Sequence, residues 1–483
     1  MAGYLWSVIC ASWLCFSPVV IAAKNPPHIV FIVADDLGWN DVGWRNPKIK
    51  TPHLDRLARH GVILNSSYVQ PVCTPSRSSF LTGYYPFKQG LQSGIFPVDR
   101  ANHLPSWFPT LPQKLKARGY ATHMVGKWHL GFCNWKYTPT YRGFDSFLGF
   151  YSGSEDYYSH MRAQGDNIGL DFRFNETAYD KDFGEYSSFV FAERAVDVIR
   201  SNNKNNPLFL YISFQAVHSP LQAPRKYLEI YKRQRNKPRR IYSAMVSAMD
   251  AAIGVIMQSL RDEGYMKNLL IVFTTDNGGA TYAGGNNMPL RGAKNTLWEG
   301  GTRATSFVYS KTLLKKKKYT HNGLFHAVDW FPTLLTAAGE KTDQKIDGVN
   351  QWMMLRKGTP SKRREVVYNI DDVRKNAAIR MGHMKLLEGQ PGHYNDWYPL
   401  PSIWTDKCMY KKDRSVFPRY QLYNITADPS EKFDIASKYP EIVTKLKHRL
   451  NKHRTHLVPT TIMRRNRKSN PKYYGGVWSP GWC

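Results

Sequence analysis

Four apolar segments of this sequence each end in side chains that can bind a ligand or transfer a proton. The residues that follow these segments are Asp35 with Asp36, Lys127 with His129, His218, and Asp276 with Asn277. If the segments are parallel strands of one sheet, their carboxyl ends meet at one edge, where open α/β sheets bind ligands. We therefore expect these side chains to converge on one site.

The acidic members of this group indicate a metal site. Two adjacent carboxylates after a buried strand repel each other unless a cation lies between them. Asp35, Asp36, Asp276 and Asn277 offer three carboxylates and an amide, the oxygen ligands that suit a hard divalent cation such as Ca²⁺. Alternatively, Asp36 and Asp276 form turns or helix caps, which the run Asp-Asn-Gly-Gly at 276–279 also fits.

The basic members could transfer protons or bind an anion. Histidine is the commonest general acid or base, so His129 and His218 are candidates, although a single histidine near a strand end is more often structural. Lys127 and Lys294 are by default ordinary surface lysines. For these four residues the spacing alone leaves both interpretations open.

Alternating strands and helices are predicted to position these residues. Apolar segments predict strands at 27–34, 120–125, 207–214 and 268–275, of which 27–34 is a continuous apolar run, and further strands are expected at 62–69 and 303–309. Helical periodicity or helix-end signals occur at 51–60, 110–118, 185–200 and 241–260. The alternation predicts an α/β fold with a large, mostly parallel sheet that helices cover on both faces.

The pattern changes after about residue 360. Short strands are expected at 365–370, 377–381 and 421–423, followed by one helix at 439–451. We predict a catalytic domain over residues 24–360 and, behind the basic linker 362–364, a smaller C-terminal α+β domain with an antiparallel sheet over residues 361–483.

The N-terminus has the pattern of a secretory signal peptide over residues 1–23, an apolar run followed by two alanines. A retained membrane anchor fits less well because the run is short and contains Pro18. Sequons at Asn65, Asn175 and Asn424 agree with a lumenal route, although Asn65 lies inside the expected strand 62–69. No later segment has 18 unbroken apolar residues, so we expect no membrane span after signal removal.

Residues 73–83 read Cys-Thr-Pro-Ser-Arg-Ser-Ser-Phe-Leu-Thr-Gly. This run resembles the signature of the sulfatase family, C-x-P-S-R followed by x-x-x-L-T-G, and a match of this length is not expected by chance. Further matching stretches are 32–39, 125–131, 153–160, 275–301 and the ending 476–478. The resemblance covers nearly all of the chain after the signal peptide, and it looks greatest for the arylsulfatase B (N-acetylgalactosamine-4-sulfatase) subgroup. It implies an alkaline-phosphatase-like sandwich.

The resemblance also implies roles for individual residues. The formylglycine-generating enzyme would convert Cys73 to formylglycine in the endoplasmic reticulum, and one Ca²⁺ would be bound by Asp35, Asp36, Cys73, Asp276 and Asn277. Arg77 and Lys127 would hold the formylglycine hydrate, and Lys127, His218 and Lys294 would contact the sulfate. The hydrate would attack sulfur, His129 would take a proton from its second hydroxyl, and His218 or Lys294 would protonate the leaving alcohol.

The implied activity is hydrolysis of sulfate esters, either on N-acetylgalactosamine 4-sulfate units of chondroitin and dermatan sulfate or on aryl sulfates, in lysosomes or outside the cell. One alternative is a phosphatase or phosphodiesterase of the same superfamily, which the signature and the single-metal ligand set argue against. Another is a catalytically silent glycosaminoglycan-binding protein, which would not need to retain Cys73, Arg77 and Lys127.

Three cysteines remain besides Cys73 after signal removal, namely Cys133, Cys408 and Cys483. They permit one bridge with one cysteine left over, or a link between two chains, and the spacing does not choose among these. So few cysteines exclude a disulfide scaffold.

The chain is strongly basic. Its 483 residues include 67 Lys or Arg and 37 Asp or Glu, a formal charge of +30, while 42% hydrophobic and 14% aromatic residues exclude a disordered polycation. Such a charge predicts a polyanionic partner. Basic clusters lie at 232–240, 315–318 and 445–472, and we interpret them as candidate glycosaminoglycan-binding surfaces, with ordinary solvated faces as the alternative. The predicted secretory routing argues against nucleic acid as this polyanionic partner.

Overall fold

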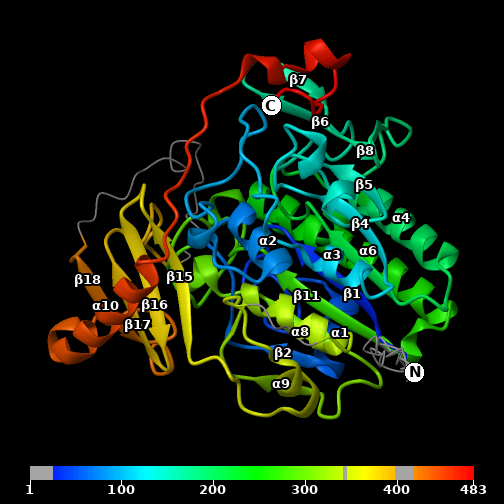
Figure 1. Cartoon of the computed structure of the whole chain (residues 1–483). Helices are drawn as coiled ribbons and strands as arrows, with labels where there is room; N and C mark the ends of the chain where they lie inside the picture. Colours follow the sequence, from blue (N-terminus) through cyan, green and yellow to red (C-terminus); the bar gives the residue numbers. More distant parts are fainter. Residues whose placement is uncertain (1–24, 341–344, 398–416) are drawn as a thin grey trace, which may run out of the picture.

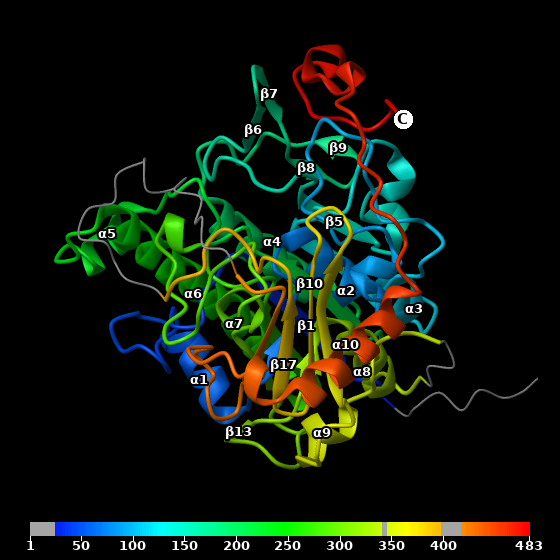
Figure 2. The ribbon, with the colours of Figure 1, turned by 90° about the vertical axis from the view of Figure 1, so that its left-hand side faces the viewer.

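The structure is a computed structural model that describes residues 25–340, 345–397 and 417–483. Within these residues the chain forms a ten-stranded sheet and, beside it, a four-stranded sheet (Figures 1 and 2). The predicted signal peptide and Cys408 lie outside the described residues.

The large sheet has the order β13-β2-β12-β11-β1-β10-β4-β5-β8-β9. Its strands are β1 (His28–Ala34), β2 (Val62–Leu64), β4 (Ala121–Lys127), β5 (Ser146–Phe150), β8 (Arg173–Phe174), β9 (Thr177–Ala178), β10 (Leu208–Ser213), β11 (Leu269–Thr275), β12 (Ser306–Tyr309) and β13 (Tyr319–His321). The five central strands from β11 to β5 are parallel, and β1, β4, β10 and β11 lie where the apolar segments predict strands. The strand β5 is not among the predicted strands. The pairs β11–β12 and β12–β2 on one side and β5–β8 and β8–β9 on the other are antiparallel.

Helices cover both faces of this sheet. They are α1 (Pro52–His60), α2 (Cys73–Thr82), α3 (Leu111–Lys116), α4 (Ser187–Ser201), α5 (Arg225–Ile230), α6 (Lys237–Asp262), α7 (Glu299–Thr302), α8 (Trp330–Ala337) and α9 (Trp352–Lys357). Alternate side chains of β1 point to opposite faces, so Val30 and Ile32 pack with α1, α4 and α6. Ile29, Phe31 and Val33 pack with α2, α3, α8 and α9 on the other face.

The small sheet is antiparallel, in the order β15-β16-β17-β18. Its strands are β15 (Glu365–Asp371), β16 (Asn376–Met381), β17 (Met384–Glu388) and β18 (Tyr420–Asn424), and α10 (Pro440–Arg454) lies across one face (Figure 2). Leu446 and Leu450 of α10 fill the core on that face, and the opposite face packs on Tyr68 and Trp298 of the large-sheet region. We keep residues 24–360 and 361–483 as proposed domains.

A C-terminal strap, which we define as residues 458–483, returns from α10 to the large-sheet region (red in Figures 1 and 2). It reaches the hairpin of β6 (Met161–Gln164) and β7 (Asn167–Leu170), where Leu170 pairs with Val477. Cys133 and Cys483 form a disulfide. This selects one of the pairings that the sequence leaves open.

The expected strand at 62–69 is wrong in one respect. It consists of two short strands, β2 and β3 (Ser67–Tyr68), because the chain turns at Asn65 and β3 pairs with β14 (Phe325–His326) in a separate sheet. Asn65 therefore lies in a turn, where its Nδ2 donates a hydrogen bond to Asn322 Oδ1 (2.8 Å). Its sequon is not inside a strand.

Among the described helices, α6 is the one long and apolar enough to cross a membrane by length and composition. The protein buries 78% of its most apolar window. This is the placement of a core helix between α1, α4 and α5.

Candidate active site

Strand register brings the predicted site residues to one edge of the large sheet. Ala34 of β1 pairs with Thr275 of β11, so Asp35 and Asp276 leave the sheet side by side. Val33 pairs with Ser213 of β10. Ser213 in turn pairs with Gly126 of β4, which places Lys127 at the same level.

Arg77 of α2 connects these strand ends through hydrogen bonds. Its guanidinium donates to Asp276 Oδ2 from both Nε (3.0 Å) and Nη2 (2.8 Å), and Nη2 also lies 3.5 Å from Asp35 Oδ2. Nη1 donates to the Lys127 carbonyl (3.1 Å) and to Ser213 Oγ. Lys127 Nζ forms a short contact with Asp35 Oδ2. Arg77, Lys127 and both carboxylates are almost completely buried.

Asp36 occupies a separate corner of the cluster. Lys294 Nζ lies 2.7 Å from Asp36 Oδ1 and 2.9 Å from Oδ2, and Asn277 Nδ2 donates to Oδ1 (2.8 Å). The Asp36 backbone has φ +59°, a left-handed conformation that aspartate tolerates better than most residues. The Tyr242 hydroxyl spans this turn, because it donates to the Asp36 carbonyl (2.8 Å) and accepts the Gly38 N–H (3.1 Å).

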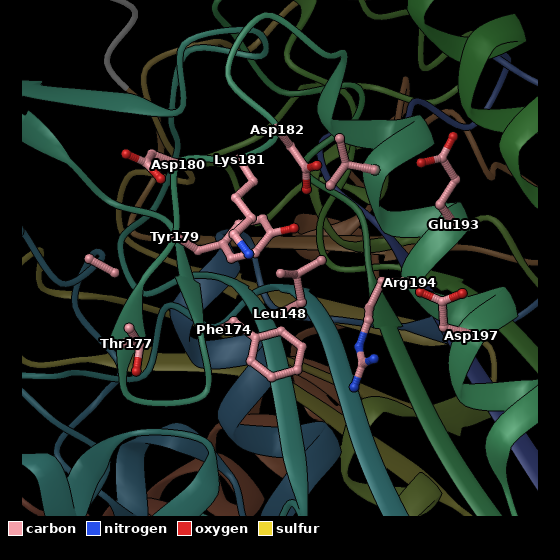
Figure 3. Close-up of a pocket in the computed structure, with 12 residues that line it drawn as sticks. Leu148, Phe174, Thr177, Tyr179, Asp180, Lys181, Asp182, Glu193, Arg194 and Asp197 are labelled. Carbon is pink, nitrogen blue, oxygen red and sulfur yellow. The ribbon is translucent and has the colours of Figure 1, made fainter.

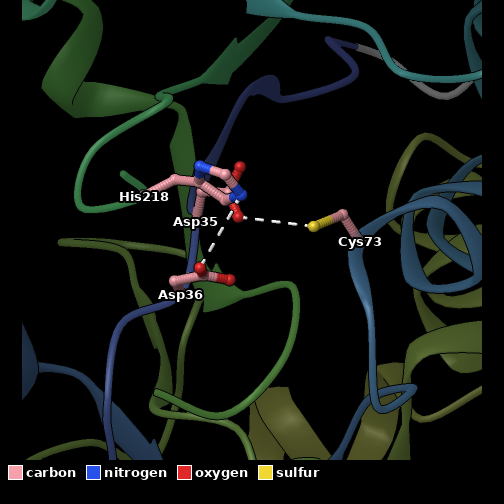
Figure 4. A group of neighbouring side chains, drawn as sticks. All are labelled: Asp35, Asp36, Cys73 and His218. Atoms are coloured by element: carbon pink, nitrogen blue, oxygen red, sulfur yellow. Dashed lines mark hydrogen bonds and ion pairs between the residues drawn. The ribbon is translucent and has the colours of Figure 1, made fainter. Parts of the chain in front are cut away.

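Cys73 is the first residue of α2 and faces the carboxylates (Figure 4). Its Sγ lies 3.5 Å from Asp35 Oδ1, and the side chain is 1% exposed. Burial, and then the charge of Asp35, raise the pKa of the thiol to about 12. A thiol held protonated is a weak nucleophile, so the unmodified residue is poorly suited to attack.

The two predicted histidines lie on either side of this centre. His129 is 2% exposed, and its Nε2 is 3.3 Å from the Phe96 carbonyl while Nδ1 meets no partner within the described chain. The His129 ring packs so closely on Gly153 that a Cβ there would lie 2.7 Å from Cε1. His218 Nδ1 donates to the Ser219 carbonyl (2.5 Å), which leaves Nε2 facing Asp36 Oδ2 at 3.9 Å (Figure 4).

The charges of the cluster set the protonation of its members. Burial, and then the charges of Lys127 and Arg77, hold the pKa of His129 well below its usual range. Burial, and then the charge of Lys294, do the same for the pKa of His218. These shifts favour the neutral form of both rings, in which one ring nitrogen carries no proton.

The carboxylates differ from one another. Burial disfavours ionisation of Asp35, but the charge of Lys127 and other basic neighbours outweighs it and lowers the pKa. Burial, and then the charge of Asp35, raise the pKa of Asp276 to about 6, and burial also raises the pKa of Asp36 despite Lys294. Three carboxylates this close resist joint ionisation, which is the condition that a bound cation relieves.

The donor set fits a divalent cation. Ligand atoms of Asp35, Asp36, Cys73 and His218 all lie within 4.8 Å of one another. Asn277 Oδ1 is buried, points to no hydrogen-bond partner among the described residues, and is the amide oxygen that the sequence predicts as a ligand. Carboxylate and amide oxygens favour a hard cation, whereas the imidazole of His218 does not.

Every predicted site residue therefore belongs to one buried cluster. Two contributors were not predicted, namely Tyr242, which holds the Asp36 turn, and Gly153, which packs on His129. Gly153 lies within one of the matching stretches, 153–160, and so carried a signal. Tyr242 carried none, because its hydroxyl reaches Asp36 from a helix about two hundred residues away.

A pocket of about 510 Å³ lies apart from this cluster, between the β8–β9 hairpin and α4 (Figure 3). Its walls include Phe174, Tyr179, Asp182, Arg194 and Asp197. None of the predicted site residues lines it. It is a surface feature of the sheet edge.

Comparisons with known proteins agree with this geometry. Residues 27–340 match the Sulfatase family. The chain is 43% identical to arylsulfatase J of Mus musculus over 95% of this chain and 81% of that protein, and 28% identical to N-acetylgalactosamine-6-sulfatase of Homo sapiens over 90% and 87%. The crystal structure of Ps i-CgsB in complex with k-i-k-neocarrahexaose superposes with a TM-score of 0.78 at 27% identity, covering 93% of this chain and 98% of that one. The likeness of this chain to a phosphonate monoester hydrolase of Agrobacterium radiobacter (TM-score 0.62, 17% identity, covering 91% of this chain and 100% of that one) shows the fold alone. The fold is thus the alkaline-phosphatase-like sandwich that the resemblance implied, and the chain belongs to the sulfatase family.

Proposed function

We propose that this sulfatase removes sulfate from N-acetylgalactosamine 4-sulfate units of chondroitin or dermatan sulfate, or from aryl sulfates, with a formylglycine derived from Cys73 and one bound Ca²⁺. The observation that carries the proposal is the buried cluster in which Cys73, at the start of α2, faces three carboxylates and three cationic side chains. The formal charges of Asp35, Asp36 and Asp276 balance those of Arg77, Lys127 and Lys294.

Ca²⁺ and formylglycine would supply, when present, two positive charges and a hydrated aldehyde as the nucleophile on sulfur. Asp35, Asp36, Asp276 and Asn277, together with the modified Cys73, are the residues proposed to hold the ion. A balanced site that gains two positive charges attracts a sulfate ester, which is an anion, into a place without bulk water. The high pKa of the Cys73 thiol supports conversion to another group, because the thiol itself is a poor nucleophile.

The chain's own residues would then orient the reactants and move protons. Arg77 and Lys127 are fixed by Asp276 and Asp35, so they present preorganised donors to the modified residue at position 73. Lys127, His218 and Lys294 would contact the sulfate. His129 is buried and neutral with a free Nδ1 on the described part of the chain, which suits it to accept a proton. The leaving alcohol would take its proton from Lys294, which is charged, or from His218 once the ring has been protonated beside the sulfate anion.

Relatives support a sulfated sugar as substrate. N-acetylgalactosamine-6-sulfatase carries its substrate in its name, and the solved relative Ps i-CgsB is in complex with k-i-k-neocarrahexaose. Arylsulfatase J, the 43% identical protein, carries the aryl alternative in its name. A comparison of 4-sulfated with 6-sulfated N-acetylgalactosamine disaccharides would decide the position that the enzyme cleaves.

We place the protein in the secretory pathway, in lysosomes or outside the cell. Residues 1–23 would direct this route, and the formylglycine-generating enzyme would act on Cys73 on the way. The Cys133–Cys483 disulfide supports an oxidising compartment.

The test is peptide mass spectrometry across residue 73 of protein from a secretory host, coupled to hydrolysis of 4-methylumbelliferyl sulfate. We expect a formylglycine-containing peptide, turnover that stops after chelation and returns with Ca²⁺, and no turnover by Cys73→Ala. The corresponding phosphate ester should be a far poorer substrate. Unmodified Cys73 without sulfate ester turnover would refute the proposal, and preferred hydrolysis of the phosphate ester would favour the phosphatase alternative.

A further inference from the structure

The C-terminal strap carries a dense, one-signed charge. Residues 458–483 contain Arg464, Arg465, Arg467, Lys468 and Lys472 and neither Asp nor Glu. A net field of this kind gathers polyanions and speeds their encounter. The question is whether the strap stands where a polyanionic substrate would lie.

The strap is fixed to the protein along its length. The Val458 N–H donates to the Phe87 carbonyl (2.8 Å), and Arg465 Nε lies 2.9 Å from Asp99 Oδ2. Its far end is held by the Cys133–Cys483 disulfide and by Trp478, which is 0% exposed. A surface that is already ordered loses little conformational entropy when it binds.

One anchor connects the strap to the loop that lines the candidate active site. Asp99, the partner of Arg465, lies three residues after Phe96. The Phe96 carbonyl is 3.3 Å from His129 Nε2, and the Phe96 N–H donates to Thr74 Oγ1 (3.4 Å), next to Cys73. The strap therefore borders the loop that covers His129.

A second anchor leads to the same histidine from the other side. Trp478 Nε1 donates to the Arg162 carbonyl (2.9 Å), and Arg162 Nη1 donates to the Ser154 carbonyl (3.3 Å). Ser154 follows Gly153, which packs directly on the His129 ring. The strap is thus linked to both loops that enclose His129, to the second of them through Arg162. In Figures 1 and 2 it is the red segment beside β6 and β7.

Three cations of the strap are available to a ligand. Arg464, Arg467 and Lys468 are exposed, and none of them forms an ion pair with a described residue. Among the acidic residues that contact the strap, Asp99 pairs with Arg465, and Asp372 accepts hydrogen bonds from the N–H and the hydroxyl of Thr460.

The remaining basic clusters are, like the strap, partly ion-paired, or they lie elsewhere on the protein. In α10, Arg449 pairs with Glu365 and Arg454 with Glu388, and in the 232–240 cluster Arg239 pairs with Asp41. The cluster 315–318 lies beside β2 and β13, at the end of the large sheet far from β6 and β7 (Figure 1). Its charge resembles that of the strap, but its position does not.

We propose that the strap is a secondary binding surface for the anionic sugars that flank the cleaved residue of a sulfated polysaccharide, with Arg464, Arg467 and Lys468 as the contacts. This rests on the proposed function, because it supposes that the cleaved residue is part of a longer chain. A polysaccharide with its sulfate at Cys73 would extend past His129 and along the strap, whereas a small aryl sulfate would occupy the catalytic cluster alone. Exposed charge contacts of this kind weaken as salt screens them over about 8 Å at physiological ionic strength.

The experiment compares two variants with the same change in charge. One reverses the strap (Arg464→Glu, Arg467→Glu, Lys468→Glu), and the control reverses the distant cluster (Lys315→Glu, Lys316→Glu, Lys317→Glu). Each full-length protein is assayed on chondroitin 4-sulfate and on 4-methylumbelliferyl sulfate, and its elution by NaCl from a chondroitin sulfate column is measured. The glutamine versions of the strap substitutions replace the first variant if its thermal unfolding departs from that of the wild type.

We expect the strap variant to raise KM for the polysaccharide about tenfold, equivalent to about 1.4 kcal/mol, with kcat for the aryl sulfate unchanged. It should elute from the column at lower NaCl than the wild type, and the control should behave like the wild type in every assay. An unchanged polysaccharide KM and elution point, or an equal effect in the control, would overturn the assignment. The column measurement needs no turnover, so it separates failure of the strap from failure of the proposed function.

Discussion

Tyr242→Phe should weaken metal binding without touching any proposed ligand. Tyr242 is 0% exposed, and its hydroxyl is shared between the Asp36 carbonyl (2.8 Å) and the Gly38 N–H (3.1 Å). These two groups lie on either side of the turn that aims Asp36 at Asn277 and Lys294. Phenylalanine keeps the ring and removes both hydrogen bonds.

The size of the effect follows from the two backbone groups that lose their partner. A buried polar group left without a hydrogen bond costs about 1–3 kcal/mol, so the loss of a partner for two groups should destabilise this turn by about 2–6 kcal/mol. Asp36 is in the left-handed region, which costs about 1–2 kcal/mol and persists only where the surroundings enforce it. If about half of this loss, about 1–3 kcal/mol, appears as weaker cation binding by the turn, Ca²⁺ affinity falls about 5- to 140-fold, since each 1.4 kcal/mol is tenfold.

The assay is calorimetric titration of Ca²⁺ into chelator-stripped protein, together with urea unfolding of the stripped protein. Tyr265→Phe is the matched control, because the Tyr265 hydroxyl also makes two hydrogen bonds, to the Ile199 carbonyl (3.1 Å) and from Asn202 Nδ2 (3.1 Å). Tyr265 is 3% exposed and lies beyond the opposite end of α6. Both variants should lose unfolding free energy, but Tyr242→Phe alone should lose Ca²⁺ affinity. Wild-type affinity in Tyr242→Phe, or an equal loss in both variants, would refute the reasoning.

Two further predictions concern buried charges. Arg77→Lys keeps the charge but cannot reproduce the paired hydrogen bonds to Asp276. We expect at least about a hundredfold loss of kcat/KM on 4-methylumbelliferyl sulfate and a fall of about 2–3 kcal/mol in the free energy of unfolding. Retained activity would contradict the positioning role of Arg77. Asp250 of α6 accepts the Leu54 and His53 N–H groups of α1 (2.7 and 3.2 Å), and burial raises its pKa from 3.8 to about 7. Because this folded pKa lies above the unfolded value, the protonated form of Asp250 stabilises the folded protein. This contribution to the unfolding free energy is complete below about pH 4 and is lost as the pH rises through about 7. It amounts to at most about 4 kcal/mol, at about 1.4 kcal/mol per pKa unit. Urea unfolding at pH 4, 5.5 and 7 should show that dependence in the wild type and a flatter one in Asp250→Asn, and equal slopes would contradict it.

The central part of the site could be predicted from the sequence because its positions follow from local patterns. The segments before Asp35, Lys127, His218 and Asp276 are mainly apolar, which favours buried parallel strands with their ends on one edge. The Cys73 signature and the stretch containing Lys294 then identify residues that no strand end supplies.

Other features depend on contacts between distant segments, and local patterns do not contain them. Residues 62–69 resemble one strand with polar residues at 65–67, but β3 leaves the large sheet to pair with β14, about 260 residues later. The partner of Cys133 is Cys483 because the strap returns to the large-sheet region. The sequence pattern does not predict β17 (Met384–Glu388), because Gly382 is the one turn signal between this strand and β16.

The position of Lys294 shows why the small domain matters to the site. Its loop is held from residues 390–397: the Gly292 N–H donates to the Asp396 carbonyl (3.0 Å), and Trp298 Nε1 donates to Asn395 Oδ1 (2.8 Å). Arg291 donates from Nε to the Asn395 carbonyl (2.6 Å) and lies 3.9 Å above the Trp298 ring. Lys294 itself forms its ion pair with Asp36. The same loop therefore contacts the active site through Lys294 and residues 390–397 through its other members. A lysine in a free loop would lose side-chain and backbone entropy on reaching a buried carboxylate, whereas here the small domain has already ordered the loop. The cation that opposes Asp36 is therefore placed by both proposed domains together.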